Sequence, residues 1–149
     1  MARIWIRDFD SADQKRAAEL INSGLGQRFG VRDDSRNPDL YDIGAFYGED
    51  CFLVALDGDE LIGTGALIYE SQLVVRIVRM HTAESRRRQG VGTALIAELE
   101  ERAQAHGARE VFLETDIDWE DAHAFYHACG YVEFRRNELG IRFHKLLAV

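Results

Sequence analysis

The sequence predicts a mixed α/β fold, an α+β type in which a central, mostly antiparallel sheet is flanked by helices. Two apolar runs, residues 51–56 and 61–69, flank an Asp-Gly dipeptide that is typical of a tight hairpin. A strand-like run at 73–82 is followed by a helical pattern and a further strand at 110–116. Because a strand, a helix and a strand in this order form a parallel crossover, the sheet should contain both strand directions.

The N-terminal elements follow from hydrophobic spacing. Residues 4–7 alternate as a short strand does, and Ser11 opens a helix that we expect to end near Gly24. The stretch 24–50 contains five glycines, so we expect it to be irregular and flexible, with one short helix at 40–46. The run at 73–82 is nearly continuous in apolar residues, which predicts a strand covered on both faces.

Two further helices and a hairpin are expected in the second half of the chain. The first helix should end at Gly107, and the second should be capped by Asp118 and end at Gly130. Strands at 131–135 and 141–147 then form the last hairpin. The expected inner faces consist of Val91, Ala94, Leu95, Leu99 and Ala103 in the first helix, and of Ala122, Phe125, Tyr126 and Cys129 in the second.

Composition excludes several classes of function. A chain of 149 residues can bury one core, so we expect a single domain over residues 1–149. The net charge of −8 argues against nucleic acid as a partner, and no apolar run approaches the ~20 residues of a membrane helix. The N-terminal residues lack a secretory pattern, and the distant Cys51 and Cys129 indicate reduced thiols, so a cytoplasmic location is expected.

One segment differs from this acidic background. No acidic residue occurs from Ser85 to Ala97, and three arginines stand together at 86–88. Residues 87–93, Arg-Arg-Gln-Gly-Val-Gly-Thr, directly precede an expected helix, and we call them the arginine–glycine turn. A helix N-terminus offers unpaired amides and partial positive charge, and glycine lets an anion approach the backbone closely. The turn therefore predicts a site for pyrophosphate.

Known phosphate motifs do not fit this turn. The dinucleotide fingerprint requires a third glycine where Leu95 stands, and the P-loop requires a lysine, which is absent nearby. On these residues alone, a tight turn with solvated arginines remains the alternative.

The spacing of Arg87, Gly90 and Gly92 resembles the signature of the GNAT superfamily of N-acetyltransferases, which is Arg or Gln, two residues, Gly, one residue, then Gly or Ala. Residues 122–131, Ala-His-Ala-Phe-Tyr-His-Ala-Cys-Gly-Tyr, resemble a second motif of that superfamily, a helix with the pattern Ala-x-x-Leu/Phe-Tyr-x-x-x-Gly-Phe/Tyr. The resemblance extends over nearly the whole chain. It implies a GNAT-like acyl-CoA N-acyltransferase fold and acetyl-CoA as co-substrate.

The resemblance also implies which residues hold acetyl-CoA. Backbone groups at 80–82 would pair with the pantetheine arm, amides of the arginine–glycine turn would hold the pyrophosphate, and Arg86 and Arg88 would face the 3′-phosphate. The implied set consists of Met80, His81, Thr82, Arg87, Arg88, Gln89, Gly90, Val91, Gly92 and Thr93. No metal is expected, because His123 and His127 lack a third ligand.

Tyr126 falls on the tyrosine of the second motif, which implies a general acid for the leaving thiolate, because a phenol with a pKa of ~10 is protonated at neutral pH. A buried core tyrosine is the alternative. Glu114, His81 and Asp116 are candidate proton acceptors, against structural roles such as an ion pair of Glu114 with an arginine. The oxyanion would be stabilised by a backbone N–H of Met80 or His81 at a strand bulge.

Three positions depart from the family pattern. Trp119 stands where an asparagine often begins the last helix, Glu84 replaces a usual proline, and Arg76 occupies the place of a glutamate that acts as a base in many members. The expected reaction is acetyl transfer to a primary amine of a small molecule by direct attack. An acyl-CoA sensor without catalysis and a protein lysine or N-terminal acetyltransferase are the alternatives. The sequence does not identify the acceptor substrate, the length of the transferred acyl group or whether the protein forms a homodimer.

Overall fold

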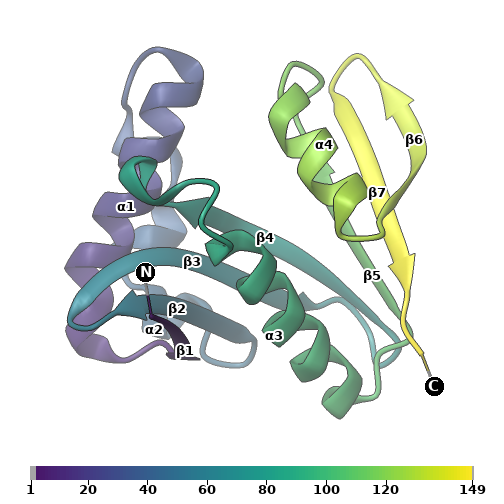
Figure 1. Ribbon diagram of the computed structural model, residues 1–149, viewed down its shortest axis with the longest axis horizontal. Coiled ribbons are helices and arrows are strands. Elements are labelled where there is room, and N and C mark those ends of the chain that lie inside the picture. The colour runs from purple at the N-terminus through teal and green to yellow at the C-terminus, as the bar shows by residue number, and fades with distance from the viewer. Residues whose placement is uncertain (1–2, 149) are drawn as a thin grey trace. The chain divides into compact units, whose positions relative to one another are not determined.

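The computed structural model describes residues 3–148 and contains one mixed seven-stranded sheet with helices (Figure 1). The strand order is β1-β2-β3-β4-β5-β7-β6, in which β4 and β5 run parallel and β5 and β7 antiparallel. This arrangement confirms the predicted fold class. The strands are β1 (Ile4–Asp8), β2 (Cys51–Asp57), β3 (Glu60–Tyr69), β4 (Val74–Thr82), β5 (Glu110–Thr115), β6 (Val132–Asn137) and β7 (Gly140–Leu146). The helices are α1 (Gln14–Phe29), α2 (Ile43–Phe46), α3 (Val91–His106) and α4 (Glu120–Ala128).

The chain divides into two compact units. Residues up to 66 form one unit with 79–99, and residues 67–78 form the other with residues from 100 onward. The single domain over residues 1–149 stays a prediction. No helix within the described part of the chain combines the length and the apolar character needed to cross a bilayer.

In the first unit, β2 forms the centre of the core and α3 packs closely on β3. Every residue of β2 from Cys51 to Leu56 is buried. Glycines on β3 let α3 approach, because a Cβ on Gly63 would lie 2.7 Å from Val91 Cγ1 and one on Gly65 would lie 3.0 Å from Leu99 Cδ1. Of the predicted stripe on α3, Val91, Leu95, Leu99 and Ala103 are buried and Ala94 is partly exposed.

Helix α1 extends further than the sequence predicts. It passes Gly24 and ends at Gly30, whose φ of 77° suits a helix C-terminus. A Cβ on Gly24 would lie 2.8 Å from His81 Nδ1, and one on Gly26 would lie 2.9 Å from Arg32 Cβ. The prediction that the helix ends near Gly24 was wrong, because these two glycines permit close packing and do not terminate the helix.

The segment before β2 also differs from the single expected helix at 40–46. It contains two short 3₁₀ helices, Asp34–Arg36 and Pro38–Tyr41, followed by the single turn of α2. Buried Leu40 and Ile43 anchor this segment to the core. Proline at the first position of the second 3₁₀ helix explains why the structure begins before residue 40.

In the second unit, α4 lies beside β5 and β7 (Figure 1). The prediction that Asp118 caps α4 was wrong, because the N-cap residue is Trp119 and its side chain makes no capping hydrogen bond. Gly130, with a φ of 93°, ends the helix as predicted. Full burial of β4 on both faces was also wrong, since only Val75 and Ile77 are buried in this strand.

Candidate active site

The arginine–glycine turn consists of the four residues directly before α3 and the first three residues of that helix. Arg88 and Gly90 have left-handed φ values of 64° and 87°. The first hydrogen bond of the helix runs from Ala94 N–H to the Gly90 carbonyl at 3.0 Å, so the amides of residues 91–93 have no acceptor within the helix. A Cβ built on Gly90 meets no atom within 4 Å, which leaves open space beside it. This geometry allows an anion to reach the amides and the positive end of the helix dipole.

Two of the neighbouring arginines have different environments. Arg86 pairs with Asp57 at 2.7 Å and with Glu60 at 2.9 Å, and hydrogen bonds to these carboxylates raise its pKa above the ordinary value. Arg88 is exposed and has no ion-pair or hydrogen-bond partner among residues 3–148. Arg86 therefore stabilises the β2–β3 hairpin, whereas Arg88 is available to an anion.

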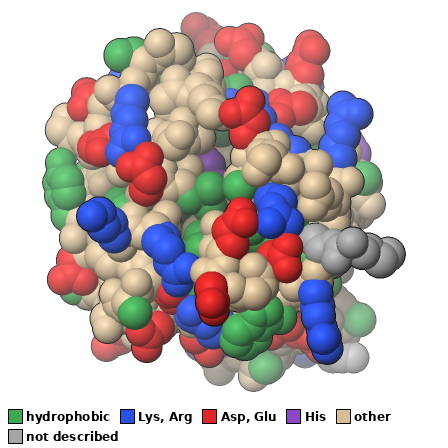
Figure 2. All heavy atoms as spheres, turned by 60° about the vertical axis from the view of Figure 1, so that its left-hand side comes forward, with side chains coloured by type: hydrophobic (Ala, Val, Ile, Leu, Met, Phe, Trp, Pro, Cys, Tyr) green, Lys and Arg blue, Asp and Glu red, His purple; other side chains and the backbone are tan. Residues whose placement is uncertain are grey.

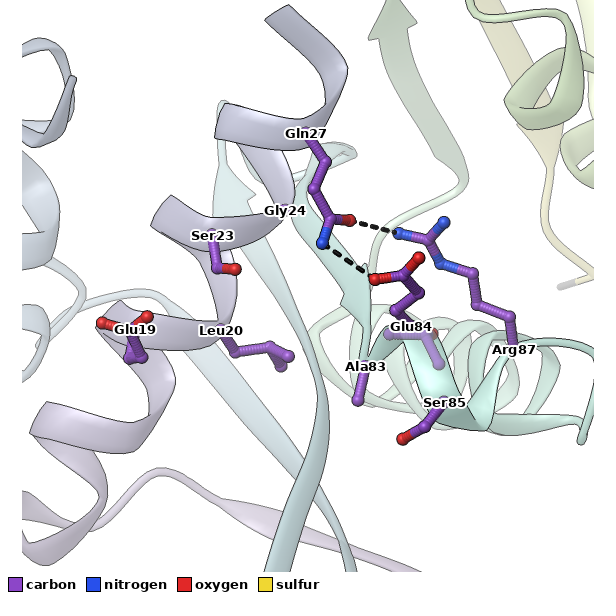
Figure 3. Close-up of a pocket in the computed structure, with 10 residues that line it drawn as sticks. Glu19, Leu20, Ser23, Gly24, Gln27, Ala83, Glu84, Ser85 and Arg87 are labelled. Atoms are coloured by element: carbon purple, nitrogen blue, oxygen red, sulfur yellow. Dashed lines mark hydrogen bonds between the residues drawn. The ribbon is translucent and has the colours of Figure 1, made fainter. Parts of the chain in front are cut away.

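A pocket of about 640 Å³ lies between α1 and the residues that lead into the turn (Figure 3). Gln27 reaches across from α1, donating to Glu84 at 3.0 Å and accepting from Arg87 Nη2 at 3.4 Å. The Arg87 amide donates to the Glu84 carbonyl at 3.4 Å, so it is already engaged. Thr82 and Arg87, both expected at the cofactor site, line this pocket. The contribution of α1 was missed because its predicted end fell before Gln27.

His81 packs against α1 at Gly24. Burial lowers its pKa to about 4, and the charges of Arg79, Arg28 and Arg87 act in the same direction. His81 is therefore neutral at pH 7. Accepting a proton from an alkyl ammonium of pKa ~10 would cost about 8 kcal/mol, so His81 is a weak base in this state. The low pKa therefore favours a structural role for His81 over a role as the proton acceptor.

Arg79 interrupts the extended path of β4 one residue before Met80. Its φ is 57°, a conformation that costs roughly 1–2 kcal/mol for a residue with a side chain. The guanidinium donates to Asp39 Oδ1 at 2.7 Å and Oδ2 at 3.0 Å. Burial acts to raise the pKa of Asp39, but hydrogen bonds from Arg79 and Tyr47 outweigh it and lower that pKa. No local sequence pattern indicates this pair, because its members lie on separate elements.

Tyr126 lies on the inner face of α4 and is 8% exposed. Its ring is centred 5.1 Å from that of Phe125, 6.0 Å from that of Tyr131 and 6.3 Å from that of Phe143. These contacts hold the ring in one place. Such packing is compatible both with a core tyrosine and with a general acid.

Glu114 faces Arg142 on the neighbouring strand β7, with a distance of 3.3 Å between its Oε2 and Arg142 Nη2. This is the ion pair that the sequence offered as the alternative to a base. Arg76, the position of the family's glutamate, pairs with Glu70 at 2.9 Å. A carboxylate is therefore present near residue 76, in the loop directly after β3, where no sequence signal identified it.

Arg32, in the segment that follows α1, donates to Glu19 and to Asp34, each at 2.7 Å. Figure 2 shows acidic and basic side chains intermingled on the drawn face, without separation by sign. Within residues 3–148, no three His, Cys, Asp or Glu side chains are grouped so that they could hold a metal ion.

The candidate site is thus a helix N-terminus that can accept an anion, beside a mixed sheet. The model of the "Acetyltransferase (GNAT) family" matches residues 16–131, and the chain belongs to this family. It is 34% identical over 100 residues to "Probable N-acetyltransferase 14" of Xenopus tropicalis, covering 64% of this chain and 48% of that protein.

It is also 37% identical over 67 residues to "Aminoglycoside N(6')-acetyltransferase type 1" of Serratia marcescens, covering 45% of this chain and 46% of that protein. The chain thus spans about half the length of these curated relatives. The PaiA N-acetyltransferase of Thermoplasma acidophilum, solved with coenzyme A, superposes with a TM-score of 0.86 at 16% identity, over 97% of this chain and 99% of that one. This likeness shows the shared fold.

Proposed function

We propose that this chain transfers the acetyl group of acetyl-CoA to a primary amine of a small molecule by direct attack of the amine on the thioester. The observation that carries the proposal is the arginine–glycine turn, in which two left-handed residues precede three helix amides without an acceptor in the helix. Family membership makes acetyl-CoA the co-substrate to test first.

The residues present fit such a ligand. Gly90 leaves open space, the amides of 91–93 can donate hydrogen bonds to pyrophosphate oxygens, and Arg88 adds an exposed positive charge. Backbone groups at 80–82 would pair with the pantetheine arm, and the N–H of Met80 or His81 would stabilise the oxyanion.

Proton transfers complete the proposed reaction. Tyr126 would protonate the leaving thiolate, because a phenol with a pKa of ~10 is still protonated at neutral pH. His81, with a pKa of about 4, is a poor direct acceptor of the ammonium proton. Glu114, which is exposed beside Arg142, would act through water.

A cationic small amine is the favoured acceptor class. The net charge of −8 attracts cations to the protein over several ångströms. One relative is named for acetylating the 6′ nitrogen of aminoglycosides, which supports including polycationic antibiotics among the candidates.

Thiol release from acetyl-CoA tests the proposal across a panel of an aminoglycoside, a polyamine, free amino acids and a peptide with a free N-terminus. Amine-dependent release with the small molecules, and an acetylated product by mass spectrometry, is the expected result. Release with the peptide alone would favour the protein acetyltransferase alternative. Binding of acetyl-CoA without release for any amine would favour the sensor alternative.

A further inference from the structure

Strand β4 departs from extended backbone geometry at Arg79, whose φ is 57°. Glycine adopts a left-handed φ without steric conflict, so a residue with a long side chain at this position indicates that the side chain itself is required. The guanidinium is only 20% exposed and the Asp39 carboxylate 9%. A two-pronged, buried ion pair therefore fixes the residue at which the strand turns.

The pair belongs to a network that reaches α1 and the residue that caps the end of α2. This residue, Tyr47, donates its hydroxyl to Asp39 Oδ2 at 2.7 Å, so that oxygen accepts from both Tyr47 and Arg79 Nε. Asn37 accepts from Arg79 Nη2 at 3.4 Å and donates to Asn22 of α1 at 3.1 Å. Both partners of the ion pair are thus held by further contacts.

The backbone at the turn is held as well. The Arg79 carbonyl accepts a hydrogen bond from the Thr64 hydroxyl of β3 at 2.8 Å, a side-chain bond where a regular ladder would use a backbone N–H. After the distortion, Ala83 N–H donates to the Ile62 carbonyl at 2.8 Å. Residues 80–82, the segment proposed to contact acetyl-CoA, lie between these two fixed points.

We propose that the Asp39–Arg79 ion pair is a positioning element that sets the orientation of the backbone at residues 80–82 toward the thioester carbonyl of acetyl-CoA. The inference rests on the proposed function. Neither side chain touches the reacting atoms. The pair acts through the backbone of β4, and its loss should change catalysis more than cofactor affinity, because the arginine–glycine turn is a separate contact.

The test replaces both partners at once, with Arg79→Gly and Asp39→Asn in one protein. Glycine keeps the left-handed φ without strain, asparagine still accepts from Tyr47, and no unpaired charge is left buried. The matched control is Glu133→Gln with Arg136→Gln, an exposed pair with a similar two-pronged geometry, 2.7 and 3.0 Å, on β6.

Three quantities are measured for each protein: coenzyme A affinity by calorimetry, the infrared carbonyl band of bound acetyl-CoA labelled with ¹³C at the carbonyl, and kcat by thiol release. Wild type should shift the band to lower frequency. In the Asp39/Arg79 variant we expect affinity within about threefold of wild type, loss of the band shift and a kcat about 10²-fold lower. The control should match wild type.

A folded Asp39/Arg79 variant with a wild-type band shift and kcat would overturn the inference while leaving the proposed function intact. Wild-type protein that does not bind coenzyme A would instead overturn the proposed function, and the inference with it. If the double variant does not fold, Arg79→Lys keeps the charge but lacks the two-pronged geometry. A full band shift in that variant would equally overturn the positioning role.

Discussion

Replacing Gly90 by aspartate should abolish stabilisation by coenzyme A while changing the free protein little. The left-handed φ of 87° costs a non-glycine residue roughly 1–2 kcal/mol, but no atom within 4 Å obstructs the new Cβ. A carboxylate at the start of α3 regains about 0.3–1 kcal/mol from the helix dipole. The net loss of about 1 kcal/mol corresponds to about 2–4 °C in Tm for a chain of this size.

The substitution should have a larger effect on the stabilisation that coenzyme A provides. Coenzyme A at 100 times its Kd stabilises the wild type by about 2.7 kcal/mol, or roughly 5–10 °C. In Gly90→Asp the negative side chain occupies the space proposed for the pyrophosphate, so this rise in Tm should disappear. Differential scanning fluorimetry with and without coenzyme A measures both the Tm of the free protein and the rise in Tm caused by the ligand.

Gly107→Asp is the matched control at the other end of the same helix. Gly107 also has a left-handed φ, 100°, and open space for a Cβ. This variant should lose stability in the free state yet keep the coenzyme A shift. A Gly90→Asp protein that keeps the full shift, or a wild type indifferent to millimolar coenzyme A, would refute the reasoning.

Four further predictions follow from single sites. Tyr126→Phe should lower kcat about 10²-fold in steady-state assays with little change in coenzyme A affinity, and near-normal turnover would falsify its role as the acid. Because burial lowers the pKa of His81 to about 4 from 6.5, the unfolded state binds more protons between those values. Stability measured by urea titration should therefore fall by about 3 kcal/mol as pH drops through that window, and His81→Gln should remove this dependence. Asp13→Asn, which breaks the ion pairs of the buried Asp13 carboxylate with the partly exposed Arg7 and Arg16, should cost about 1.5 kcal/mol in urea unfolding and leave the coenzyme A shift unchanged; a lost shift would contradict a purely structural role. Arg76→Glu places a second carboxylate beside Glu70, so we expect a raised kcat only when Glu70→Gln is added, and an unchanged kcat in that folded double variant would argue against position 76 as the base site.

Local patterns predicted the elements well where neighbouring residues determine them. The hairpin at Gly58 and the end of α4 at Gly130 depend on turn chemistry within a few residues, and both glycines have the left-handed φ that such turns use. The arginine–glycine turn was predicted for the same reason, since a glycine-rich segment before a helical stripe is a local feature.

The errors concern contacts between residues far apart in the sequence. Gly24 looked like a helix end, but it packs on His81, which lies on another element. The Asp39–Arg79 pair joins residues separated by 40 positions, and an arginine inside a strand pattern gives no indication of a left-handed φ. Sequence periodicity carries no information on such pairings without tertiary structure.

Backbone amide NMR spectra recorded during a titration with coenzyme A show whether the arginine–glycine turn binds the pyrophosphate. We expect the largest shifts at the amides of Gly90 and residues 91–93, with a second group at 80–82, and the same pattern in Gly107→Asp. Saturating coenzyme A that leaves those amides unmoved, or that shifts only signals from the β6–β7 hairpin, would contradict this expectation.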